Sequence, residues 1–269
     1  MTGPTLVWLD CETTRLDESR RPWEVAAIIR QPGHRDVEYH WFVDILDIDL
    51  THANPVSLDI GRFWERHPQA RWVTRTGDRV HLVHDVPGIL PEPDGVYRES
   101  LMLTEVAELT AGQAVICGSN PAFDTGTLAP RMAHWDIEPG WHYHPEDVPG
   151  MARGWLLAQG CAAPRKSDEI ARACGLDPDW YDRHTALGDC RLFRDLHRIV
   201  SQPPKRPPGG FWPVGGRQAR QWRTCAGCGD DIWPNEMVYP ADASGDTSDA
   251  AGVQCAVCEA QTVQAGMGW

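Results

Sequence analysis

The protein has 269 residues, of which 42% are hydrophobic, and its formal net charge is −13. This length allows one large domain or two smaller ones, and the hydrophobic share is enough to build a sizeable core. No basic N-terminal stretch precedes a long apolar run, and no segment approaches the roughly 18 apolar residues that a membrane span needs. We therefore expect a globular cytoplasmic protein and exclude a membrane protein.

The acidic balance also excludes a broad basic surface for nucleic acid, because attraction to phosphate normally requires an excess of Lys and Arg. Any attraction to phosphate groups must therefore be local. It has to come from bound cations or from small basic patches.

Apolar runs typical of strands alternate with helical patterns over residues 1–200. The expected strands lie at residues 6–9, 25–29, 39–43 and 114–117. This alternation predicts an α/β layer fold with a mixed sheet flanked by helices. The pattern leaves the order of elements within residues 59–110 open.

A helix is expected after the strand at 114–117. Leu128, Met132 and Trp135 follow one another at helical spacing, which predicts a buried stripe. Asp124 would then lie in the first turn, facing the carboxyl end of the strand. Pro130 inside the pattern predicts a kink or an early stop.

Two further helices are expected towards residue 200. The first has Ser167 as its cap and stops at Gly175. The second covers about residues 186–200 and places Asp189 on one face with apolar residues, namely Phe193, Leu196 and Val200. A carboxylate on a buried stripe needs a partner.

Asp10 and Glu12 follow directly after the first strand. Residues two apart on a strand point to the same face, so both carboxylates can bind the same metal cluster. Taken alone, the pair could simply end a strand at the surface.

His184 precedes Asp189 by five residues, which is about 140° around a helix, so the two side chains cannot share a helical face. We expect His184 on the loop before the helix, leaning over the site. Taken alone, it could be a capping or packing residue, as Asp124 could be an ordinary acidic residue favoured by the helix dipole.

Together, D-x-E-T-T after an early strand, N-x-x-F-D after a later one and H-x-x-x-x-D at a C-terminal helix resemble the DEDDh exonucleases. That family includes RNase T and the exonuclease subunits related to DNA polymerase III epsilon. The resemblance covers roughly residues 5–200 and implies a ribonuclease H-like fold and 3′→5′ exonuclease activity. It implies His184 as general base and four ligands of two divalent ions: Asp10, Glu12, Asp124 and Asp189.

The chemistry of these residues agrees with that assignment. Four ionised carboxylates bring about −4 into one site, and two Mg²⁺ or Mn²⁺ ions bring about +4. Such ions activate water and stabilise a leaving 3′ oxygen, so 5′-mononucleotides are the expected products. An unperturbed imidazole titrates near 6.5, which leaves His184 able to accept a proton.

The expected substrate is a single-stranded or frayed 3′ end, with DNA slightly favoured over RNA. The alternative is a catalytically silent, nuclease-like adaptor that recruits nucleic acid or protein partners through a C-terminal module. The resemblance makes Thr13 and Thr14 candidate contacts for the terminal nucleotide. Arg15 replaces the glycine common in the family, and its cation either touches a phosphate or points to solvent.

Two C-x-x-C pairs near the end predict a small zinc-ribbon-like module over residues 224–269. Their four thiolates suit one structural Zn²⁺ and are Cys225, Cys228, Cys255 and Cys258. The 26 residues between the pairs exceed the usual spacing, and the alternative is four free thiols in a disordered tail. The acidic module is at least as suited to a protein partner as to nucleic acid.

Residues 201–223 read as a basic linker rich in Pro and Gly. Its basic residues alternate with aromatic residues, so the linker could hold a nucleic-acid single strand by charge and stacking. The alternative is a flexible, solvated tether. The residues concerned are Lys205, Arg206, Arg217, Arg220 and Arg223, with Phe211, Trp212 and Trp222.

Overall fold

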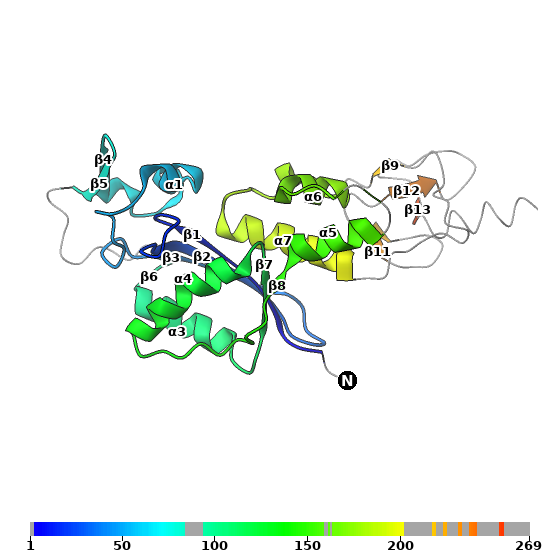
Figure 1. The fold of residues 1–269 in the computed structure, drawn as a ribbon, viewed down its shortest axis with the longest axis horizontal. Helices are drawn as coiled ribbons and strands as arrows, with labels where there is room; N and C mark the ends of the chain where they lie inside the picture. Colours follow the sequence, from blue (N-terminus) through cyan, green and yellow to red (C-terminus); the bar gives the residue numbers. More distant parts are fainter. Residues whose placement is uncertain are drawn as a thin grey trace, which may run out of the picture.

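The computed structural model describes residues 3–83, 94–158, 161 and 163–201, together with short strands beyond residue 201. Its centre is a six-stranded sheet in the order β6-β3-β2-β1-β7-β8, with helices on both faces (Figure 1). None of the helices in the described ranges is long and apolar enough to cross a membrane.

The sheet is mixed, as predicted. Its strands are β1 Leu6–Thr13, β2 Pro22–Arg30, β3 Val37–Val43, β6 Val96–Tyr97, β7 Val115–Gly118 and β8 Glu146–Asp147. Strands β1, β2 and β3 pair antiparallel, whereas β6, β7 and β8 add to the two sides in parallel. All four predicted strands are confirmed, and β1 continues past the predicted run to Thr13 because β2 pairs with it that far.

Side chains of β1 alternate between two hydrophobic cores. Val7, Leu9 and Cys11 belong to one core and Trp8 to the other. The first core contains side chains of α3 (Glu99–Leu109) and α4 (Pro121–His134). The second contains side chains of α5 (Val148–Ala158), α6 (Ser167–Ala173) and α7 (Ala186–Ser201), on the opposite side of the sheet in Figure 1.

The helices depart from the sequence-based expectations at three positions. Helix α4 does not stop at Pro130 but continues to His134, held in the core by its buried stripe. Trp135 lies just past that end and is 39% exposed, so its predicted place on the stripe is wrong. Ser167 is the first residue of α6 and not its cap, since Lys166 occupies the cap position without a side-chain bond.

The segment between β3 and β6 consists of short elements. They are α1 Pro55–Ile60, α2 Phe63–Arg66, a 3₁₀ turn Ala70–Trp72, and a hairpin of β4 Val73–Thr76 and β5 Arg79–Leu82. Phe63 anchors the segment because its ring is fully buried and meets that of Trp23 edge to face. A further 3₁₀ turn, Pro178–Trp180, precedes α7.

Beyond α7 the structure describes strands β9 Arg217–Gln218, β10 Arg223–Thr224, β11 Asp231–Ile232, β12 Met237–Pro240 and β13 Val253–Cys255. β12 pairs with β9 and β13, so strand pairing begins inside the predicted linker. Cys255 ends β13, while Cys225, Cys228 and Cys258 lie outside the described residues. The predicted zinc site therefore stays a prediction.

Candidate active site

Asp10 and Glu12 are placed by the alternation of β1. The odd-numbered residues of this strand face the core that contains α3 and α4, so Asp10 and Glu12 share the opposite face with Trp8. Helix α7 covers that face and carries Asp189 in its first turn. Carboxylate oxygens of Asp10, Glu12 and Asp189 consequently lie within 4.8 Å of one another.

Asp124 enters the site from an open edge of β1. β7 pairs with β1 along Leu6–Trp8 and ends at Gly118, so the edge of β1 beyond Trp8 is available to α4. There the amide of Cys11 donates a hydrogen bond of 3.0 Å to Asp124 Oδ1. Asp124 is buried and is held in place by the backbone of the strand that carries Asp10 and Glu12.

The four carboxylates that the sequence singled out line one open pocket of about 270 Å³. Its other walls come from β1, the loop after β1, the β7–α4 turn, α4, and α7 with the loop before it. The remaining lining residues are Cys11, Leu16, Ser119, Asn120, Phe123, Arg183 and Phe193.

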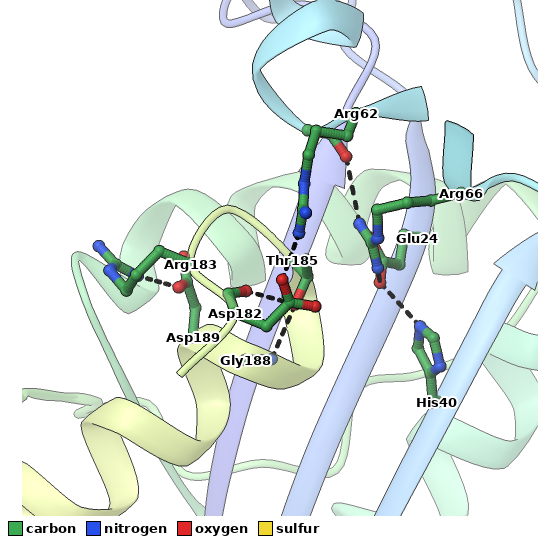
Figure 2. Close-up of polar contacts among 10 residues, drawn as sticks. Glu24, His40, Arg62, Arg66, Asp182, Arg183, Thr185, Gly188 and Asp189 are labelled. Carbon is green, nitrogen blue, oxygen red and sulfur yellow. Dashed lines mark hydrogen bonds and ion pairs between the residues drawn. The ribbon is translucent and has the colours of Figure 1, made fainter. Parts of the chain in front are cut away.

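Arg183 is a pocket residue that sequence reasoning missed. Its guanidinium forms an ion pair with Asp189 (Figure 2). Its Nε also donates a hydrogen bond of 2.9 Å to Asp168 Oδ1. From the sequence, Asp189 was expected to need a partner. The signal that could have identified it is the position of Arg183, a cation directly before His184. Arg183 supplies positive charge where the buried Asp189 carboxylate would otherwise be left unpaired.

His184 lies on the loop before α7, as expected, with a positive φ of 60°. It is exposed and, among the described residues, is not part of the pocket lining. Partial burial lowers its pKa, as do Arg183 and Arg62, while Asp168 acts in the opposite direction. The neutral imidazole that a general base requires is therefore favoured.

A cap at the start of α7 fixes the loop that carries Arg183 and His184. Thr185 Oγ1 accepts a hydrogen bond of 3.0 Å from the amide of Gly188 and donates one of 2.9 Å to the Asp182 carbonyl (Figure 2). A Cβ atom on Gly188 would lie within 3.0 Å of the carbonyl oxygens of Tyr181 and Asp182. The loop can pack this closely against the helix because position 188 has no side chain.

Replacing Gly188 with alanine is therefore expected to push this loop away from α7. We expect the free energy of unfolding to fall by about 2 kcal/mol, because backbone atoms at this contact cannot rotate away. Any turnover should fall about tenfold as His184 moves. Denaturant titration measures the first effect, and Gly154→Ala is the matched control because nothing lies within 4 Å of its added Cβ. Equal stability of the two variants would contradict the packing argument.

A buried ion cluster lies behind Glu12. Glu24 pairs in register with Glu12 across β1 and β2 and is fully buried. Arg66 Nη1 donates to Glu24 Oε2 at 2.6 Å, and His40 Nε2 lies 2.7 Å from Glu24 Oε1 (Figure 2). Burial raises the pKa of Glu24, but the hydrogen bonds from His40 and Arg66 lower it overall. Glu24 therefore remains ionised.

The pocket carboxylates repel one another without a bound cation. Burial and the charge of Glu24 raise the pKa of Glu12 to about 7. Burial also raises the pKa of Asp124 to about 8, with a contribution from Glu12. Burial, Asp124 and Glu12 raise the pKa of Asp10 well above its ordinary value. Converging, charged oxygen donors of this kind suit Mg²⁺ or Mn²⁺.

These shifts predict how the metal-free protein responds to pH. A carboxyl whose pKa is raised on folding binds its proton more tightly in the folded state, so stability is lost as pH rises. For Glu12 and Asp124 that window runs from about pH 4 to their folded pKa values of about 7 and 8. With a chelator present, Tm should be lower at about pH 8 than at about pH 5, and Mg²⁺ or Mn²⁺ should raise Tm more at the higher pH. Calorimetry measures both. A metal effect independent of pH would contradict the prediction.

The three candidate substrate contacts, Thr13, Thr14 and Arg15, lie at the end of β1 and in the turn that follows it. None of them is among the described residues that line the pocket. Thr13 Oγ1 donates to the Arg15 carbonyl at 2.8 Å, and Thr14 Oγ1 accepts from the Arg21 amide at 3.1 Å. Arg15 pairs with Asp17 at 2.6 Å and donates to the His52 carbonyl at 3.0 Å. All three side chains stabilise the turn, and their contact with a substrate stays a prediction.

Known structures share this architecture, which is the ribonuclease H-like fold of exonucleases expected from the sequence. The zinc-bound complex of Escherichia coli exonuclease I with single-stranded DNA matches with a TM-score of 0.54 and 16% identity, over 74% of this chain and 40% of that chain. The same enzyme in complex with a dA16 oligonucleotide matches with a TM-score of 0.53 and 15% identity, over 76% of this chain and 42% of that chain.

A product-bound structure of exonuclease I gives a TM-score of 0.51 at 16% identity, over 74% of this chain and 43% of that chain. The protein thus matches only about two fifths of the length of these chains. No protein family matches the sequence, and no curated protein matches it either.

Proposed function

We propose that this protein is a metal-dependent exonuclease that shortens single-stranded or frayed nucleic acid from its 3′ end and releases 5′-mononucleotides. The observation that carries the proposal is the convergence of Asp10, Glu12 and Asp189 within 4.8 Å, with Asp124 fixed beside them on the Cys11 amide. Gathering four carboxylates in one partly buried pocket is unfavourable unless cations bind there. The shared fold with exonuclease I supports the same conclusion.

Asp10, Glu12, Asp124 and Asp189 would hold two Mg²⁺ or Mn²⁺ ions. When bound, such ions lower the pKa of an attacking water and neutralise charge on the phosphate and the leaving oxygen. His184 would accept the proton of that water, since its lowered pKa keeps it neutral at physiological pH. Arg183, now paired with Asp189, could instead bind a phosphate oxygen once cations neutralise that carboxylate.

Two apolar side chains give the pocket a surface for a nucleobase. Leu16 lines it from the loop after β1 and is 74% exposed, and Phe123 lines it from α4. The Arg20 guanidinium lies 4.2 Å from the centroid of the Phe123 ring, which fixes the position of that ring. Stacking of this kind tolerates any base sequence, as an exonuclease requires.

DNA is the favoured substrate, because the E. coli exonuclease I structures with this fold hold single-stranded DNA or a dA16 oligonucleotide. A catalytically silent adaptor is not favoured. Such a protein would have no need to keep buried carboxylates whose repulsion destabilises the fold.

The proposal is tested with single-stranded DNA and RNA labelled at the 5′ end and incubated with Mg²⁺ or Mn²⁺. We expect a ladder of labelled products that shorten one nucleotide at a time, and no products with a chelator. A 3′-phosphorothioate end should slow the reaction at the first bond. If neither nucleic acid is shortened, or if labelled 5′-mononucleotide appears first, the proposal is wrong.

A further inference from the structure

A second group of metal-ligating side chains lies outside the pocket. Cys117 is on β7, Glu146 on β8 and His197 on α7, so three elements distant in sequence each contribute one residue. One ligand atom from each lies within 4.8 Å of the other two. These side chains take no part in the proposed nuclease chemistry.

The spacing of the three donors is close to that of a tetrahedral metal site. His197 Nε2 lies 3.0 Å from Glu146 Oε2, and Cys117 Sγ lies 3.8 Å from the same oxygen. Donors bound to Zn²⁺ at ordinary bond lengths and tetrahedral angles lie about 3.4 to 3.6 Å apart. The observed distances fall on either side of this range, so only small side-chain movements would be needed to admit an ion.

The surroundings are built like a site that an ion can reach from one side. Cys117 is fully buried and His197 is 5% exposed, while the side chain of Glu146 is 38% exposed. The ring of Trp8 meets the His197 ring edge to face at 5.6 Å, which holds the imidazole in its orientation. An ion and a water ligand would therefore enter from the side of Glu146, which is open to solvent.

We propose that Cys117, Glu146 and His197 bind a divalent transition-metal ion of the zinc class. A thiolate and an imidazole select Zn²⁺ or Co²⁺ over Mg²⁺, which prefers oxygen donors. The thiolate and carboxylate bring two negative charges and the neutral imidazole none, so one divalent ion balances the site. The fourth position is left for water.

The local charges bear on how the ion binds. Burial and Glu146 raise the pKa of the Cys117 thiol, so an ion that binds there has to displace its proton. Arg30 is the nearby cation, and its guanidinium lies 4.7 Å from the Trp8 ring centroid. Its charge is offset by Asp36, to which it is paired at 2.7 Å.

A metal at this position would connect two strands of the sheet to the helix that carries Asp189. Asp189 and His197 are eight residues apart on α7, which is about 12 Å along the helix axis. The ion would therefore act as a structural clamp at a distance from the nuclease pocket. Its existence does not depend on the proposed nuclease activity.

The test measures Co²⁺ binding to the full chain, stripped of metal and kept in excess Mg²⁺. We expect the parent to bind one more equivalent of Co²⁺ than Cys117→Ser or His197→Gln. The difference spectrum between parent and Cys117→Ser should show a thiolate-to-cobalt charge-transfer band. Cys174→Ser is the matched control, because Cys174 lies outside this trio, and it should bind as the parent does. The C-terminal cysteines are present in every variant, so their contribution cancels.

The variant Glu146→Gln separates loss of metal binding from loss of folding, since this side chain is partly exposed and the substitution preserves its shape. We expect its affinity for Co²⁺ at this site to fall about a hundredfold, with circular dichroism unchanged. If parent, Glu146→Gln and Cys117→Ser bind equal amounts of Co²⁺ with equal spectra, the trio is a hydrogen-bonded cluster and the proposal is overturned.

Discussion

Replacing Asp10 with asparagine is expected to lower the rate of nucleotide release about a thousandfold. Asparagine preserves the shape of the side chain but removes a charge from the cluster formed with Glu12 and Asp189. The stabilisation that bound metals give a phosphoryl transition state amounts to several kcal/mol, and each 1.36 kcal/mol changes the rate tenfold. Single-turnover assays with end-labelled single-stranded DNA and saturating Mg²⁺ measure the loss.

The same variant should be more stable than the parent when metal is absent. Asp10 is half-buried beside Asp124 and Glu12. Burial and these two carboxylates raise its pKa, so removing its charge relieves repulsion. Asp136→Asn is the matched control, since Asp136 is exposed and its positive φ of 56° is one that asparagine tolerates. Turnover by Asp10→Asn at the parent rate would rule out the metal site as the source of activity.

Replacing His184 with asparagine is expected to lower the rate several hundredfold, within the range for loss of a general base. Asparagine adopts positive φ more readily than most residues, so the backbone at 184 should keep its conformation. The exposed His144 offers the control substitution His144→Asn. Circular dichroism and Tm of both variants should match those of the parent.

The pH profile separates a base from a positioning role. The pKa of His184 is lowered by burial and by Arg183 and Arg62, and Asp168 opposes this. The parent rate should therefore rise with pH and level off around or below about pH 6.5, where the imidazole has lost its proton. His184→Asn should lose this rise. A parent profile that is flat while chemistry limits the rate, or a variant that keeps the rise, would exclude His184 as the base.

The sheet and the position of each carboxylate on its strand or helix could be predicted because local rules decide them, whereas grouping the four into one site rested on the family resemblance. Apolar runs set the strands, and the alternation of side chains along β1 places Asp10 and Glu12 on one face. The first turn of α4 places Asp124 at the end of a strand, as expected. Asp189 also lies on a buried face of α7, as its spacing from Phe193 predicted.

The remaining features depend on contacts between distant segments. Glu24 reads as an ordinary strand residue, and only the fold brings Arg66 and His40 to it. The contact of Asp124 with the Cys11 amide links residues 113 positions apart, through a backbone group that no side-chain pattern reports. Trp135 continued a helical spacing in the sequence, but the helix ends one residue earlier and its indole reaches Glu99.

The alternation of β1 also determines which sequence changes the protein can tolerate. One face of the strand builds the core with Val7 and Leu9, and the other carries Asp10 and Glu12. Substitutions on either face leave the other in register. Losing or gaining a single residue ahead of Asp10 would turn the carboxylates towards the apolar core and the apolar residues towards the pocket. The spacing along β1 is thus under a stricter constraint than the identity of most residues in it.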